Sequence, residues 1–246
     1  MLHSPDPALR EAFDLRFALP SACADQIAAG EADIGILPGI EVARQKLDYF
    51  RATGIACNGP VRSILLVSKV PFARVRTLAV DSGSRSSVML SRVLLAEKYG
   101  AEPRVFAHPP DLVPMLEKAD AALLIGDPAL RLDLATLPFA WLDLGGEWVD
   151  MTGLPMVFAV WGGRKEVMRP EYEDLFVGSC RWGLTHIDEI ARAEAPIRQV
   201  SEETVRTYLT RHIMFELDDR AHQGLNLYLE HALRLDRTAV PGGVSV

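Results

Sequence analysis

Residues 63–100 read SILLVSKVPFARVRTLAVDSGSRSSVMLSRVLLAEKYG, and this stretch indicates the fold class. Its apolar runs Ser63–Val67 and Leu78–Val80 are typical of buried strands. A serine-rich turn then leads into Ser86–Tyr99, which predicts a helix that ends at Gly100, because glycine adopts the left-handed conformation at little cost. Strands that alternate with helices predict an α/β fold of βαβ units with mainly parallel sheets.

The same alternation continues on both sides of this stretch. Further strands are expected at Leu15–Leu19, Ala32–Leu37, Ala121–Ile125 and Met156–Trp161, and a helix that Gly30 ends is expected at Ala22–Ala29. From about Pro170 onward the pattern predicts helices only. These are Glu171–Ala193, Val205–Arg211 after a Ser201 cap, and a last helix that Asp218 or Asp219 caps and that runs through Arg234.

The helical last third of the chain needs a sheet to cover its apolar stripes. The simplest solution is a chain that passes out to a second lobe and returns, with crossovers near Val67–Arg74 and Trp161–Arg164. We therefore expect one lobe from residues 1–68 and 162–246, a second lobe from residues 69–161, and a ligand cleft between them.

Composition excludes several classes of protein. The 246 residues are 49% hydrophobic and carry a formal net charge of −7, which argues against a disordered chain and against a nucleic-acid partner. No apolar run approaches the ~20 residues of a membrane-spanning helix. The start of the chain does not read as a signal peptide, and three cysteines without a Cys-x-x-Cys pair are typical of a reduced, cytoplasmic protein.

The motifs of common cofactors and nucleophiles are missing from the sequence. There is no Gly-x-Gly-x-x-Gly, no Gly-Lys-Ser/Thr phosphate loop and no Gly-x-Ser-x-Gly elbow. The six histidines are scattered, and His212, Glu216 and His222 lack a further ligand at metal spacing. The sequence therefore predicts neither a metal nor an organic cofactor.

The serine-rich turn is the best candidate for a binding site. It lies between a predicted strand and a predicted helix, where backbone N–H groups have no acceptor within the helix and the helix dipole favours an anion. Ser84, Ser86 and Ser87 add hydroxyl groups, and Arg85 lies among them. We predict a carboxylate site here; the alternative is that Asp81 or Ser84 simply caps the helix.

Two other turns are predicted to reach the cleft. Asn58-Gly59-Pro60 forces a turn before a buried strand and brings Asn58 and Arg62 to the cleft edge, where a fork of donors suits a second carboxylate. Gly126 and Asp127 end another buried strand, at the end where ligand crevices form. Both have plainer interpretations, namely an ordinary turn with Arg62 at the surface and an Asp127 that caps the next helix.

Several of these segments resemble the chorismate dehydratase family, which opens the futalosine route to menaquinone. The resemblance is carried by Gly54–Ser63, Asp81–Gly100, Gly30–Pro38, Leu124–Asp127 and Thr152–Trp161. It implies a two-lobed fold like a type II periplasmic binding protein, with two hinge crossovers. It also implies a cytoplasmic carbon–oxygen lyase that converts chorismate to 3-[(1-carboxyvinyl)oxy]benzoate without metal or cofactor.

The resemblance also suggests roles for the candidate residues. Ser84, Ser86 and Ser87 would hold one carboxylate of chorismate, and Asn58 or Arg62 would hold the other, but no residue is assigned as the catalytic base. The family begins with a strand that ends in a Tyr-Leu-Asn-like turn, which Met1–Pro7 lacks. We therefore expect a start site placed too far downstream, with a groove left in the sheet of the first lobe.

Three other functions remain open at this stage. A protein of the same fold that binds a carboxylate without chemistry needs only the cleft. The related 1,4-dihydroxy-6-naphthoate synthase needs a histidine base, for which His108 is the candidate in the middle of the chain. The effector domain of a regulator is disfavoured because the chain has no basic patch. The oligomeric state is also left open.

Overall fold

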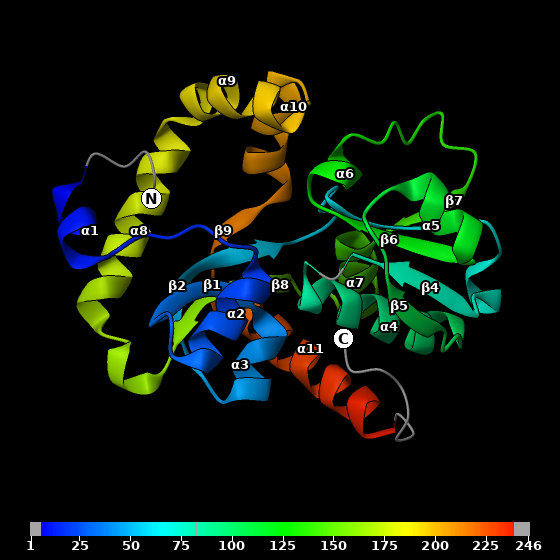
Figure 1. Cartoon of the computed structure of the whole chain (residues 1–246), viewed down its shortest axis with the longest axis horizontal. Coiled ribbons are helices and arrows are strands. Elements are labelled where there is room, and N and C mark those ends of the chain that lie inside the picture. Colours follow the sequence, from blue (N-terminus) through cyan, green and yellow to red (C-terminus); the bar gives the residue numbers. More distant parts are fainter. Residues whose placement is uncertain (1–5, 82, 239–246) are drawn as a thin grey trace.

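The computed structural model describes residues 6–81 and 83–238, and in these ranges the chain forms two separate sheets, seen side by side in Figure 1. The first sheet has the order β1-β8-β2-β9, with β1 at Ile34–Pro38, β8 at Met156–Gly163, β2 at Asp48–Cys57 and β9 at Met214–Glu216. The second has the order β5-β4-β6-β3-β7, with β5 at Arg104–Ala107, β4 at Thr77–Val80, β6 at Ala121–Ile125, β3 at Ile64–Ser68 and β7 at Ala140–Asp143.

Each sheet contains one strand that the sequence analysis assigned to the other lobe. Strand β3 was expected in the first lobe but pairs in the second sheet, and β8 was expected in the second lobe but lies between β1 and β2. The chain therefore crosses between the lobes at residues 58–63 and 153–155, one strand earlier at each crossover than the sequence suggests. Both strands are apolar on both faces, so their pattern fits either sheet equally well.

The expectation of mainly parallel sheets is wrong for the same reason. Among the described residues only β4–β5 and β4–β6 are parallel pairs, whereas β3 runs antiparallel to both of its neighbours and β8 to both of its own. A strand that enters a sheet directly from a crossover arrives in the opposite direction to the strands of the βαβ units around it.

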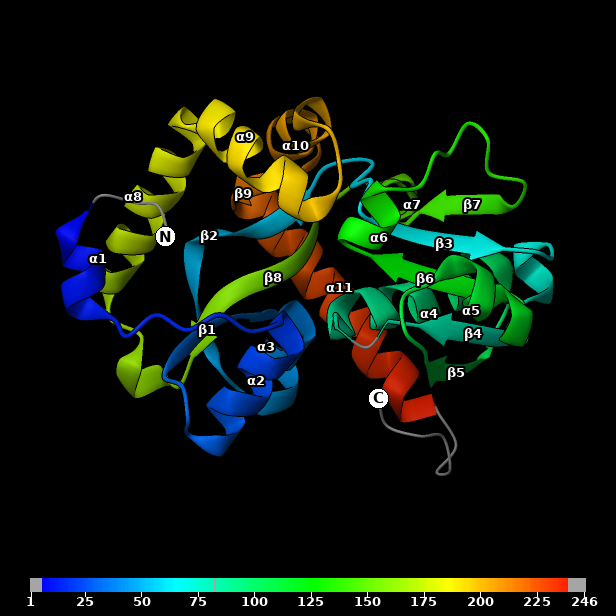
Figure 2. The same cartoon turned by 45° about the horizontal axis from the view of Figure 1, so that its top comes forward.

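Helices cover both sheets. The first lobe, from α1 to β2 and from β8 to α11, contains α1 (Pro7–Ala12), α2 (Pro20–Ala29), α3 (Gly39–Gln45), α8 (Pro170–Thr185), α9 (Ile187–Arg198), α10 (Glu202–Thr207) and α11 (Asp219–Thr238). The second lobe, from β3 to α7, contains α4 (Arg85–Tyr99), α5 (Leu112–Lys118), α6 (Asp127–Leu130) and α7 (Leu144–Thr152). Single 3-10 turns lie at Phe72–Arg74 and Lys165–Val167. Figure 2 shows α11 running from β8 toward α4, and it packs against both.

Several predicted elements are confirmed. Gly30 and Gly100 end α2 and α4 at φ +75° and +63°, and the strand at Ala121–Ile125 has the predicted bounds. Ser201 caps α10 by accepting from the Thr204 N–H group, and Asp218 accepts from the Ala221 N–H group at the start of α11.

Other predicted elements are wrong. Leu15–Leu19 is not a strand: it carries Phe17 73% exposed and has no neighbouring strand among the described residues. Helix Glu171–Ala193 is interrupted at His186, which separates α8 from α9. Strand β9 lies after Pro170, where only helices were expected, and β2, β5 and β7 were not predicted at all. The edge strands β5, β7 and β9 have three or four residues, too few to show a repeating pattern, whereas the ten-residue β2 lies inside its sheet and alternates irregularly between buried and exposed residues.

Candidate functional site

The serine-rich turn begins α4, as the sequence predicts, and its hydroxyl groups interact with one another. Ser84 is the N-cap of α4: its Oγ accepts from the Ser87 N–H group at 3.5 Å and lies 3.0 Å from the Ser87 Oγ. The Asp81 carboxylate accepts from the Gly83 N–H group at 2.9 Å, which closes the turn. Ser82 lies outside the described residues. The alternative reading of Ser84 as a helix cap is therefore correct, and its side chain is half-buried.

Arg85 and Ser86 point toward the first lobe. The Arg85 guanidinium donates to both carboxylate oxygens of Asp25 at 2.8 and 2.9 Å and lies 3.5 Å from the buried Glu41. The Oγ of Ser86, which is fully buried, accepts from the Ile40 N–H group at 3.3 Å. The first turn of α4 thus contacts the middle of α2 and the start of α3, so the positive end of the α4 dipole faces the first lobe.

The crossover at residues 58–63 is held by one carboxylate. Asp143 accepts from the N–H groups of Val61 (2.9 Å) and Arg62 (2.6 Å), and the same side chain caps α7 through Gly145 and Gly146. This anchor fixes the turn that contains Asn58, which is exposed, and Gly59, which has φ +135°.

Arg62 leaves this turn at φ +66°, and its guanidinium donates to carbonyl groups at the end of α6. The acceptors are the carbonyl oxygens of Ala129 (2.8 Å) and Leu132 (2.5 Å). Burial lowers the pKa of this guanidinium, while Asp143 and Asp133 oppose the shift. The predicted role of Arg62 in holding a carboxylate stays a prediction, and these carbonyl groups compete with it.

The turn after β6 lies against the same crossover. Gly126, at φ +71°, is the N-cap of α6 and donates its N–H to the Ser63 carbonyl at 2.7 Å. The Asp127 carboxylate forms an ion pair with Arg198 of α9 at 3.1 Å. Asp127 therefore joins the second lobe to the C-terminal helices of the first.

Two residues that the sequence analysis did not assign to this site complete the region. The Tyr208 hydroxyl lies 3.1 Å from the Ser63 Oγ, and the His212 Nδ1 lies 2.9 Å from the Pro60 carbonyl oxygen. Burial raises the pKa of the Tyr208 hydroxyl, so Tyr208 is held neutral. Both belong to a π-helical turn at Tyr208–His212, a feature often found at functional sites. No local sequence pattern predicts such a turn, and its contacts join residues that are about 150 positions apart in the sequence.

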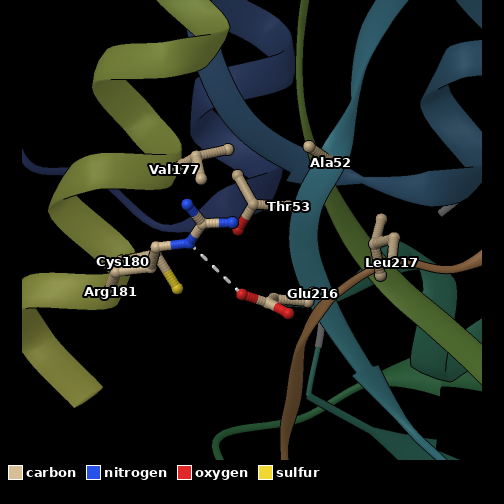
Figure 3. Close-up of a pocket in the computed structure, with 7 residues that line it drawn as sticks. All are labelled: Ala52, Thr53, Val177, Cys180, Arg181, Glu216 and Leu217. Carbon is tan, nitrogen blue, oxygen red and sulfur yellow. Dashed lines mark hydrogen bonds and ion pairs between the residues drawn. The ribbon is translucent and has the colours of Figure 1, made fainter. Parts of the chain in front are cut away.

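A cavity of about 220 Å³ lies elsewhere, between α8 and strands β2 and β9 (Figure 3). Arg181 and Glu216 form an ion pair of 3.5 Å at its edge, and none of the predicted site residues lines it. His108 is exposed in the loop before α5, where its Nδ1 lies 2.8 Å from the Pro109 carbonyl oxygen. Among the described residues, no group of three or more His, Cys, Asp or Glu side chains is placed to hold a metal ion, and no helix is long and apolar enough to span a bilayer.

Two chorismate dehydratases are similar in sequence to this chain. A chorismate dehydratase of Thermus thermophilus is 28% identical over 238 residues, which cover 89% of this chain and 87% of that enzyme. A chorismate dehydratase of Campylobacter jejuni is 32% identical over 127 residues, covering 52% of this chain and 43% of that enzyme.

Solved structures show the same fold at low sequence identity. An Archaeoglobus fulgidus protein superposes with a TM-score of 0.70 at 16% identity, covering 94% of this chain and 92% of its own. The Escherichia coli periplasmic aliphatic sulphonate binding protein superposes with a TM-score of 0.58 at 15% identity, covering 93% and 78%. The fold is thus that of a periplasmic binding protein. Because the family model for menaquinone biosynthesis also matches residues 4–234, this chain belongs to the menaquinone biosynthesis family.

Proposed function

We propose that this chain is a cytoplasmic chorismate dehydratase, a carbon–oxygen lyase that removes water from chorismate to give 3-[(1-carboxyvinyl)oxy]benzoate. The observation that carries the proposal is the match to the Thermus thermophilus chorismate dehydratase over 89% of this chain. The start of α4 supports it independently, because the half-buried Ser84 hydroxyl and a helix N-terminus suit a carboxylate.

The substrate carries two carboxylates, and the candidate site offers donors for each. One carboxylate is assigned to the half-buried Ser84 hydroxyl at the start of α4, with the fully buried Ser87 hydroxyl lying 3.0 Å behind it. The other is assigned to the crossover, where Asn58 is exposed and Arg62 already donates to two carbonyl groups. Asn58 is therefore the stronger of these two predicted ligands.

The reaction breaks two bonds between the cyclohexadiene ring and its substituents, C3–H and C4–O. The C3–H bond releases its proton, its electron pair forms the new ring double bond, and the C4 hydroxyl leaves with a proton as water. The product ring is aromatic, which supplies much of the driving force. The protein's contribution is to immobilise both carboxylates between the lobes and to exclude solvent from the ring.

The test is incubation of the purified protein with chorismate, followed by ultraviolet spectroscopy and mass spectrometry of the product. We expect a product lighter by one water, with the absorbance of a substituted benzoate. Chorismate that binds but is not consumed would instead identify a binding protein without chemistry, and no binding at all would reject the proposed substrate.

Two matched variants test the site. Ser84 and Ser201 are both N-cap serines, so Ser84→Ala and Ser201→Ala each remove one cap, at a cost of about 1 kcal/mol. We expect Ser84→Ala to raise KM for chorismate about tenfold, because it also removes a carboxylate donor. Ser201→Ala should leave KM unchanged. Equal KM values for the two variants would show that the substrate does not contact the start of α4.

A further inference from the structure

Helix α4 is held at both ends by the hydroxyl group of a tyrosine. At its start, the Tyr228 hydroxyl donates to the Ser86 carbonyl oxygen at 3.0 Å. At its end, the Tyr99 hydroxyl donates to Glu147 at 3.0 Å. Tyr228 is fully buried on α11, with its ring edge-on to that of Trp148 at 6.1 Å. A buried hydroxyl that loses its acceptor is costly, so this bond restricts how α4 and α11 can move apart.

Ser86 is contacted from two elements of the first lobe. Its carbonyl oxygen accepts from Tyr228, and its Oγ accepts from the Ile40 N–H group in the first turn of α3. Helix α3 begins after Pro38, whose side chain cannot cap it, so Ser86 supplies that cap from the opposite lobe. These two bonds fix the first turn of α4 against the first lobe.

The Ser84 hydroxyl assigned to the substrate lies two residues before Ser86, at the N-cap of the same helix. A donor to a carboxylate acts only within a few tenths of an ångström and a narrow range of angles, so a rotation of this turn misaligns the Ser84 hydroxyl. We propose that Tyr228 is a positioning residue whose hydroxyl group, through the Ser86 carbonyl, orients the Ser84 hydroxyl toward the substrate carboxylate. This inference rests on the proposed function and extends it to a side chain buried behind the site.

The kinetic test compares Tyr228→Phe with Tyr99→Phe. Each variant removes one hydrogen-bonded hydroxyl group from an end of α4 and keeps the aromatic ring. We expect Tyr228→Phe to raise KM for chorismate about tenfold with kcat within about twofold of wild type, because a misaligned donor weakens binding of substrate and transition state alike. Tyr99→Phe should leave both constants unchanged.

A purely structural role for Tyr228 gives a different result. In that case Tyr228→Phe lowers the fraction of folded enzyme, and therefore the apparent kcat, while KM stays the same. That outcome, or wild-type kinetics in Tyr228→Phe, would overturn the inference.

A second readout does not depend on the reaction. Hydrogen–deuterium exchange followed by mass spectrometry should show faster exchange of the amide groups of residues 85–89 in Tyr228→Phe than in wild type, and no change there in Tyr99→Phe. Unchanged exchange in this turn would reject the role of Tyr228 in fixing it. If exchange accelerates but the wild-type protein does not dehydrate chorismate, the positioning contact stands and the proposed function fails.

Discussion

His222 is a buried imidazole that the folded protein keeps neutral. Its Nε2 lies 3.0 Å from the Arg51 carbonyl oxygen and its Nδ1 lies 3.3 Å from the Tyr49 hydroxyl, and only 7% of the residue is exposed. Burial lowers its pKa from 6.5, and the positive charge of Arg51 adds to this, while Asp218 and Asp219 oppose it. Protonation of His222 is thus easier in the unfolded chain than in the folded protein.

This difference predicts a pH dependence of stability. Above the unfolded pKa of 6.5 the contribution of the neutral imidazole is fully present, and it is lost as the pH falls through the lower, folded pKa. We expect the free energy of unfolding, measured in urea, to decrease below pH 6.5, and to decrease less in His222→Gln. His108→Gln, which removes an exposed imidazole, is the control and should keep the wild-type profile. A profile of His222→Gln that parallels wild type would contradict the prediction.

Helix α11 can lie close to β8 because one of its residues has no side chain. A Cβ atom on Gly224 would collide with the Pro155 carbonyl oxygen, which immediately precedes β8. Gly178 in α8 has open space where its Cβ would lie. The same substitution at these two helical glycines therefore has opposite expected effects.

We expect Gly224→Ala to destabilise the protein by about 3 kcal/mol, because backbone of α11 or of residue 155 has to move. Gly178→Ala should be neutral or stabilising by up to about 1 kcal/mol, since alanine favours a helix and meets no neighbour. Thermal unfolding of both variants measures the difference. Equal unfolding midpoints would show that α11 is not packed against Pro155 as closely as described.

Elements with strong local signals could be predicted from the sequence, and those that depend on distant partners could not. Helices α2 and α4 were predictable because Gly30 and Gly100 end them, and the Ser84 cap was a stated alternative. Leu15–Leu19 has the pattern of a strand, but a strand also needs a neighbour, and none is described. Strand β9, of three residues, exists only because Met214 and Glu216 pair with β2.

The features of the candidate site also fall into those that local sequence predicts and those that depend on distant residues. The turns at Ser84 and Gly126 are local, and the sequence located both. The contacts that hold them, Tyr208 with Ser63 and Tyr228 with Ser86, join residues 145 and 142 positions apart. A single sequence contains no pattern that links side chains across such distances, so residues of this kind were missed.

The two lobes share one continuous apolar core, and Cys57 lies within it at the crossover. This residue ends β2, is fully buried, and would contact any Cβ placed on Gly145 of α7. Burial, followed by the charge of Asp143, raises the pKa of its thiol to about 12. The thiolate, which is the reactive form, is therefore almost absent in the folded protein.

We expect iodoacetamide at pH 8 to modify the partly exposed Cys23 and Cys180 before Cys57, as measured by mass spectrometry of peptides. In increasing urea, modification of Cys57 should rise together with the loss of helical circular dichroism, because its exposure requires the junction between the lobes to open. Modification of Cys57 at the rate of Cys180 in native buffer would show instead that this junction opens locally.

The position of β8 in the first sheet determines which of the two sheets can form first during synthesis. Strands β1 and β2 are complete by residue 57, but each of them pairs with β8, which begins at residue 156. All five strands of the second sheet lie between residues 64 and 143. During synthesis on the ribosome, the middle of the chain can therefore fold first. Strands β1 and β2 can form their sheet only after about a hundred further residues, including β8, have been added.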